Sequence, residues 1–196
     1  MRTKLNPANF VNGRVRLFDV PEESDQWSQV SPVIPNLVLY QWSELTSKLL
    51  TAGDSAYRIS GMLLEFENVA SPGDTVTAPS FDRSRTISYY QGLGSFPGRD
   101  YLRVPLSSAQ VETSGAPYTN NSMIFNARST GTVGMHGETF SDSVNSVIFG
   151  ASLVAMVDPG DASQDLLFSS LYFDAADQQP KLPTSQIGIE WSVDLQ

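Results

Sequence analysis

A strict alternation of apolar and polar residues near the C-terminus constrains the fold of this chain more than any other feature. The stretch "QIGIEWSVDL" spans residues 186–195. Its apolar positions are Ile187, Ile189, Trp191, Val193 and Leu195. Successive side chains of a strand point to opposite faces, so the pattern predicts a β-strand with one buried and one solvated face. We therefore expect residues 186–195 to form part of the core.

Other segments with strand-like patterns are spread along the chain. The further predicted strands are 14–18, 57–68, 86–90, 100–106, 122–127, 146–161 and 165–173. The stretch 146–161 is apolar on both faces, which indicates either one buried central strand or two short strands bent at Gly150. Pro105 cannot donate a ladder hydrogen bond, so it indicates a sheet edge or a bulge at that position.

One segment has a helical pattern. Trp42, Leu45 and Leu49 recur at helical spacing in "QWSELTSKLLTAG", and Glu44 stands four residues before Lys48. The glycine that ends this stretch suits a C-terminal cap. The sequence thus predicts a single helix over residues 41–53.

These elements predict an all-β fold: a two-sheet antiparallel sandwich, jelly-roll-like, with one short helix and an extended N-terminal arm. A chain of 196 residues with 40% hydrophobic residues can bury one core. Residues 19–36 are rich in Pro and Ser, which argues against a helix or a central strand there. We assign 1–36 to an arm and surface segment, with a first strand at 14–18, and 37–196 to a single β-sandwich domain.

The charge balance argues against nucleic acid as a partner. The chain has 12 Lys and Arg against 21 Asp and Glu, a net charge of -9. Phosphates would be repelled rather than neutralised by such a surface. The acidic excess is concentrated after residue 103, because residues 1–103 carry 10 - 11 = -1 and residues 104–196 carry 2 - 10 = -8.

Cysteine is absent, which excludes disulfide frameworks and thiolate chemistry and suits a reducing compartment. The sequence has neither a run of about 20 apolar residues nor a signal-peptide core, so we expect no membrane insertion and no export by that route.

Residues that could support catalysis have simpler structural interpretations. His136 is the only histidine, and the glycines around it in "STGTVGMHGETFSD" favour a turn or hairpin over a phosphate-binding loop. Glu65 and Glu67 could pair as glycosidase carboxylates, but solvated charges on an outer face explain them more simply. Asp158, Asp161 and Asp165 lack the order of a calcium loop and favour a β-turn with Pro159 at its second position. We therefore predict no catalytic residues, no metal and no cofactor.

The segment 83–103 combines aromatic residues with the densest positive charge of the chain. A docking face for an acidic partner, a sugar-binding platform and internal loop packing all fit this composition. The candidate interface residues are Arg83, Arg85, Tyr89, Tyr90, Phe96, Arg99, Tyr101 and Arg103.

Residues 57–106 contain "YRISGMLLEFENVASPGDTVTAPSFDRSRTISYY" followed by "GRDYLRVPL", a strand-loop-strand pattern without a catalytic signature. This segment resembles one found in small structural proteins of tailed bacteriophages. The resemblance implies a virion protein of the capsid decoration (cement) type, assembled in the bacterial host cytoplasm. Its partners would be the major capsid protein or other virion proteins, and it would be a homo-oligomer, with a trimer favoured. A carbohydrate-binding jelly-roll module of a phage fibre or receptor-recognition protein is the alternative, and an enzyme ranks third.

Overall fold

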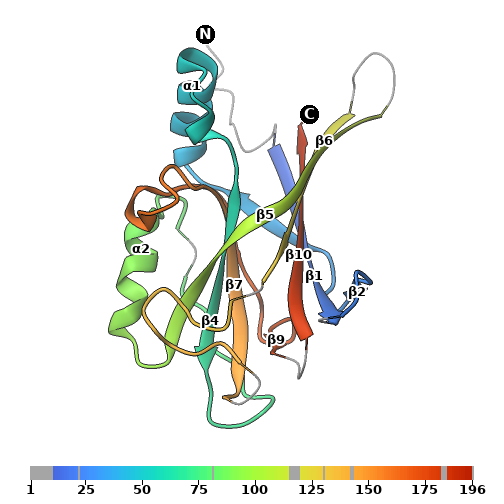
Figure 1. The fold of residues 1–196 in the computed structure, drawn as a ribbon, viewed down its shortest axis with the longest axis vertical. Helices are drawn as coiled ribbons and strands as arrows, with labels where there is room; N and C mark the ends of the chain where they lie inside the picture. The colour runs from blue at the N-terminus through green and yellow to red at the C-terminus, as the bar shows by residue number, and fades with distance from the viewer. Residues whose placement is uncertain are drawn as a thin grey trace.

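An antiparallel β-sheet dominates the structure, a computed structural model that describes residues 11–21, 23–80, 82–114, 120–129, 131–141, 144–181 and 185–195 (Figure 1). The strands are β1 (Val11–Pro21), β2 (Ser28–Gln29), β3 (Ile34–Val38), β4 (Gly61–Asn68), β5 (Arg99–Ser114), β6 (Asn120–Arg128), β7 (Ser146–Ala155), β8 (Leu166–Tyr172), β9 (Gln179–Pro180) and β10 (Ser185–Leu195). The α-helices are α1 (Gln41–Ala52) and α2 (Ile87–Gly92), and the 3-10 turns are η2 (Ser55–Tyr57), η3 (Leu93–Ser95) and η4 (Ala162–Gln164).

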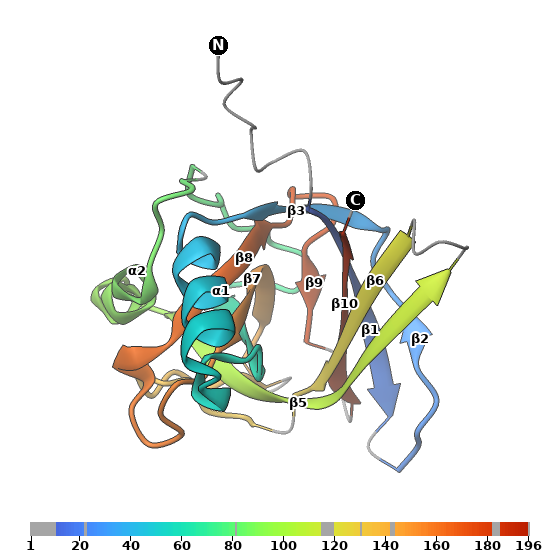
Figure 2. The same cartoon turned by 90° about the horizontal axis from the view of Figure 1, so that it is seen from above.

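The sheet closes on itself. Its strands follow the order β10-β6-β5-β4-β7-β8-β3-β1, and β1 pairs in turn with β10. Figure 2 shows the strands surrounding a common interior. The prediction of a β-rich antiparallel fold is confirmed. Two separate sheets are not confirmed, because β5 pairs first with β4 and then with β6, with a shift of register between Leu106 and Ser108 beside Pro105.

Strand β10 forms one wall of the interior, as its alternation predicted. It pairs with β1 on one side and with β6 on the other. Trp191 is fully buried in the main core cluster, together with Ile187, Ile189 and Val193. Glu190 and Asp194 lie on the opposite face, where they pair with arginines of β1. The prediction that this strand is integral to the core is confirmed.

The other half of the sheet is buried on both faces. Strand β7 is one continuous, fully buried strand, which decides between the two interpretations of its sequence. A second core cluster covers the outer side of β4 and β7. It consists of Leu39, Leu63, Ile87, Tyr90, Leu93, Tyr101, Val154 and Leu167.

The strand predicted at 86–90 is wrong, because this segment begins α2. Ile87, Tyr90 and Leu93 recur every three residues, which places all three against the sheet when the chain is helical. The short stretch "TISYY" also fits an alternating strand, so its local pattern alone was ambiguous.

The prediction that 19–36 holds no central strand is also wrong. Strand β3 begins at residue 34 and pairs with β1 through 34–36 and with β8 through 37–38. Pro35 pairs with β1, whereas the pairing of β3 with β8 begins only at residue 37. The missing N–H of Pro35 therefore interrupts no hydrogen bond between β3 and β8. Of the predicted arm, residues 1–10 lie outside the described residues, and 11–13 begin β1.

Helix α1 matches its prediction closely. It ends at a glycine cap, Gly53, with φ 62°. Lys48 Nζ lies 2.9 Å from Glu44 Oε1. Leu45 is buried, and Trp42 packs edge-on against Phe168 with 5.6 Å between ring centroids. The helix stands at one end of the molecule (Figure 1). No helix in the described ranges is long and apolar enough to cross a membrane.

Candidate functional site

A densely connected polar site is centred on Glu65 of β4. Its carboxylate is completely buried. Tyr89 Oη donates to Glu65 Oε2 at 2.9 Å, and Tyr90 Oη donates to Oε1 at 2.8 Å. Arg85 Nη1 lies 3.7 Å from Oε1. The interpretation of Glu65 as a solvated outer-face charge is therefore wrong: α2 and the loop before it cover this face of β4.

Two further strands complete the site. Tyr90 Oη lies 2.5 Å from Ser152 Oγ of β7, which in turn contacts Ser170 Oγ of β8. The Arg85 guanidinium stacks between two aromatic rings, 3.9 Å from the centroid of Tyr89 and 4.5 Å from that of Tyr172. A cation between two aromatic faces is stabilised electrostatically. The site thus joins α2 to three strands.

The burial of this site sets the ionisation of its members. Desolvation raises the pKa of Glu65 above its ordinary value, although Arg85 and the tyrosine hydroxyls favour the charged form. Burial, together with the Glu65 carboxylate, also raises the pKa of Tyr89 and of Tyr90. Both phenols are therefore donors at neutral pH. The Glu65 carboxylate accepts a hydrogen bond from each tyrosine and pairs with Arg85 inside the fold, an arrangement suited to fixing α2 on the sheet.

A second buried ion pair joins β5 to the loop before β8. Arg103 Nη2 lies 2.7 Å from Asp165 Oδ1, and Nε donates to Oδ2 at 2.8 Å. The same guanidinium donates to the carbonyl oxygens of Asp158 and Pro159. Hydrogen bonding to Asp165 raises the pKa of Arg103.

The predicted turn at Pro159 is confirmed by the bond from Asp161 N to Asp158 O. Asp161 accepts hydrogen bonds from Ser163 and Gln164. Within the described ranges, no group of three His, Asp or Glu side chains could hold a metal ion.

The glycine-rich segment around His136 is a hairpin, as predicted, with a bridge between Val133 and Thr139. The backbone amides of this hairpin do bind an anion, as those of a phosphate-binding loop would. The anion is the side-chain carboxylate of Asp100 in β5. The buried Asp100 carboxylate accepts hydrogen bonds from His136 N at 2.8 Å and from Glu138 N at 3.0 Å. A Cβ on Gly134 would lie 2.3 Å from Asp100, so only glycine allows this approach. The protein itself fills the position that a bound phosphate would need.

The ring of His136 also has a structural partner. Its Nε2 lies 2.9 Å from the Tyr90 carbonyl oxygen and therefore donates to it. The ring meets Tyr101 edge-on with 5.6 Å between centroids. His136 thus ties the hairpin to α2 and β5.

The structure turns several of the eight predicted interface residues inward. Arg85, Tyr90 and Tyr101 are buried. Arg99 pairs with Glu67, and Arg103 with Asp165. Tyr89 is half-buried against Glu65, and Arg83 is half-buried beside α1, where its carbonyl accepts from Tyr40 N. Phe96 is 53% exposed. The aromatic and positively charged residues of 83–103 therefore serve internal packing more than they form an exposed docking face.

A different exposed surface lies on α1. Leu50 is 77% exposed, Leu49 is 37% exposed, and Tyr40, directly before the helix, is 65% exposed. Leu49 and Leu50 are neighbours near the C-terminal end of α1, whereas Tyr40 lies about 15 Å away along the helix axis. Exposed apolar side chains of this size indicate a contact surface when a partner covers them. We call these three residues the α1 surface.

Comparison with protein-family models, with curated proteins and with solved structures gave no match for this chain.

Proposed function

We propose that this protein is a non-enzymatic virion structural protein of the capsid decoration (cement) type, which binds neighbouring major capsid subunits. The observation that carries the proposal is the α1 surface. Helix α1 exposes two adjacent leucines near its C-terminal end and follows an exposed tyrosine at its N-terminal end, and covering these side chains with a partner is favourable in free energy. The resemblance of residues 57–106 to virion proteins supplies the class of partner.

The polar interior of the described residues supports a scaffold rather than an enzyme. Glu65, Asp100 and Asp165 are each fully buried and bonded to neighbouring side chains or amides of the chain. Catalytic groups need access to a substrate within hydrogen-bonding reach. These carboxylates instead fasten loops and α2 to the sheet.

The oligomeric part of the proposal follows from the same resemblance, and the jelly-roll-like part follows from the strand pattern. We propose a homo-oligomer, with a trimer favoured, and a jelly-roll-like description in which β3 and β5 are shared by the two halves of the closed sheet. Light scattering on the purified chain measures the oligomeric state directly.

The alternative of a sugar platform at 89–101 has little support, because Tyr90 and Tyr101 are buried.

The test uses phage particles encoded by the same genome, purified on density gradients. Mass spectrometry should find the chain in the particle fraction, and purified protein should rebind to particles from which the gene has been deleted. Leu50→Glu places a charge at the most exposed residue of the α1 surface and should lower occupancy at least tenfold. Thr51→Glu adds the same charge at the neighbouring exposed position and is the matched control.

Absence of the chain from particles contradicts the proposal. Equal occupancy of the Leu50→Glu variant and the wild type would reject the α1 surface as the contact. Melting curves of both variants confirm that the domain itself is intact.

A further inference from the structure

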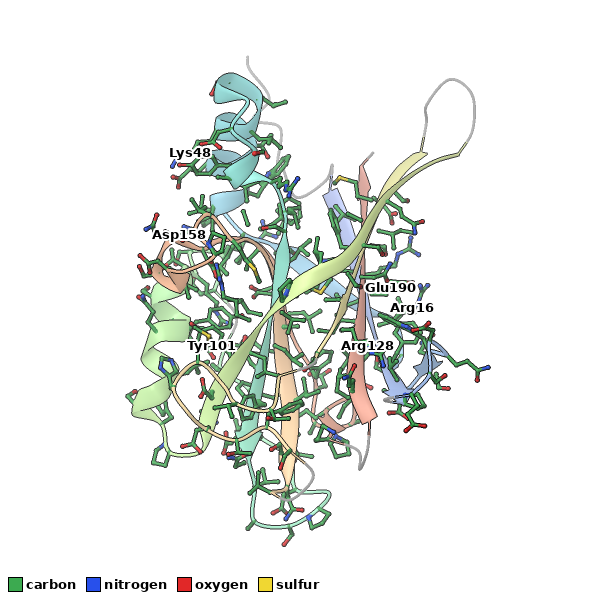
Figure 3. The ribbon with its side chains drawn as sticks, viewed as in Figure 1. Arg16, Lys48, Tyr101, Arg128, Asp158 and Glu190 are labelled. Carbon is green, nitrogen blue, oxygen red and sulfur yellow. The ribbon has the colours of Figure 1, made fainter. Side chains whose placement is uncertain are left out.

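A groove of about 350 Å³ crosses the outer face of the sheet, away from the α1 surface. It is lined by Phe18, Trp27, Ser107, Ser108, Asn126 and Glu190. Figure 3 shows Glu190 beside Arg16 on this side of the molecule, with Lys48 of α1 on the other. Two aromatic rings and four hydrogen-bonding side chains therefore meet in one surface depression.

The aromatic part of the groove depends on a glycine in β10. Phe18 of β1 is the register partner of Gly188, and Trp27 lies over that glycine. A Cβ at position 188 would lie 2.6 Å from the Trp27 ring, so another residue would push the indole off the sheet. Phe18 meets Trp27 edge-on, with 5.4 Å between centroids. The half-buried indole is thereby fixed in position before any ligand arrives.

The polar side chains of the groove come from positions two residues along each strand from Phe18 and Gly188, on the same face of the sheet. Arg16, Glu190 and Asn126 are register partners across β1, β10 and β6, and Ser108 of β5 continues the row. Asn126 Nδ2 donates to Ser108 Oγ at 3.1 Å. Arg16 donates to Glu190 Oε1. Glu190 and Asn126 both line the groove, and each has side-chain oxygens that can accept hydrogen bonds.

We propose that this groove binds a neutral saccharide. An aromatic surface beside a few fixed polar groups fits a pyranose ring, whose C–H face is apolar and whose rim consists of hydroxyls. The Trp27 indole would cover the sugar face, while Glu190 and Asn126 would accept hydrogen bonds from hydroxyls.

Charge selects against acidic sugars. Two arginines lie in register with residues of the groove, and both are engaged within the protein: Arg16 pairs with Glu190, and Arg128, opposite Gly188, bonds Gln186 and the Pro21 carbonyl oxygen. The chain also carries a net charge of -9. The inference does not depend on the proposed virion role, since it concerns a different face of the molecule.

The experiment uses the full chain and a panel of oligosaccharides built from glucose, galactose, mannose and N-acetylhexosamines, with sialylated and sulfated glycans alongside. Array binding followed by calorimetry should identify at least one neutral ligand. Trp27→Ala should weaken that binding at least tenfold, because it removes the surface that covers the ring. Asn126→Ala should weaken it several-fold and leaves both aromatic rings in place.

Phe96→Ala is the matched control, since it removes an exposed aromatic ring near α2 and should leave binding unchanged. Melting temperatures show whether each variant is folded. Failure of every neutral saccharide to bind at millimolar concentration, binding of charged glycans alone, or full affinity in both Trp27→Ala and Asn126→Ala would each overturn the proposal.

Discussion

At the scale of single residues, burial decides the chemistry of this protein more than residue type does. Glu65 and Glu67 stand two positions apart on the same face of β4. Glu65 is fully enclosed, whereas Glu67 is partly exposed and pairs with Arg99. The same carboxyl group is therefore a buried network centre at one position and a surface ion-pair partner at the other.

Glu65 makes the stability of the protein depend on pH. Because burial raises its pKa in the folded state, protonated Glu65 favours folding. This contribution is complete below the ordinary pKa of 4.5 and is lost as the pH rises through the folded-state pKa. Glu65→Gln does not titrate at this position. The free energy of unfolding of the wild type, compared with that of Glu65→Gln, should therefore fall as the pH rises. Urea unfolding of both proteins from pH 4 to pH 8 measures the difference.

The control for this prediction is Glu44→Gln, which removes an exposed carboxylate from α1. A stability difference between wild type and Glu65→Gln that stays constant with pH would contradict the assigned shift of the Glu65 pKa.

At the scale of elements, β10 holds the sheet closed. It pairs with β1 along residues 185–195 and with β6 on its other edge. Its central side chain, Trp191, is completely buried in the main core cluster. Removing a buried tryptophan side chain leaves a cavity that neighbouring strands cannot fill without moving.

Trp191→Ala should therefore destabilise the isolated chain by about 3 to 5 kcal/mol. Thermal and chemical unfolding followed by circular dichroism measures this loss. Ser192→Ala changes the neighbouring residue on the outer face and should alter stability by less than about 1 kcal/mol. An unchanged melting curve for Trp191→Ala would show that β10 contributes little to the core.

At the scale of the whole molecule, closure links the two ends of the described chain. Val11 is the register partner of Leu195, so the first and last strands cannot leave the sheet independently. Unfolding should therefore be a single cooperative transition. Folding should be slow for the size of the chain, in milliseconds to seconds, because most pairings join distant residues.

Stopped-flow fluorescence and far-ultraviolet circular dichroism measure both properties. Coincident transitions by the two probes are expected. Loss of β10 signal before the rest of the sheet, detected by hydrogen exchange, would contradict the cooperative link.

The sequence by itself determined the elements whose buried face can be read from the spacing of their own apolar residues. Helix α1 has its apolar spacing, its Glu44–Lys48 pair and its glycine cap within 13 consecutive residues, and β10 has five alternating apolar positions. The turns at Pro159 and around His136 likewise follow from local backbone chemistry. In each case the physical cause lies within a few residues of its effect.

Only the tertiary structure decided which faces were covered and which strands met. The chain segment that covers Glu65, including α2, lies about 20 residues away along the sequence, and the partners of β3 come from distant strands. The groove at Trp27 joins side chains from four strands and depends on the contact of that ring with Gly188. Such contacts arise when the sheet closes, because closure places distant residues side by side and sets their exposure to water.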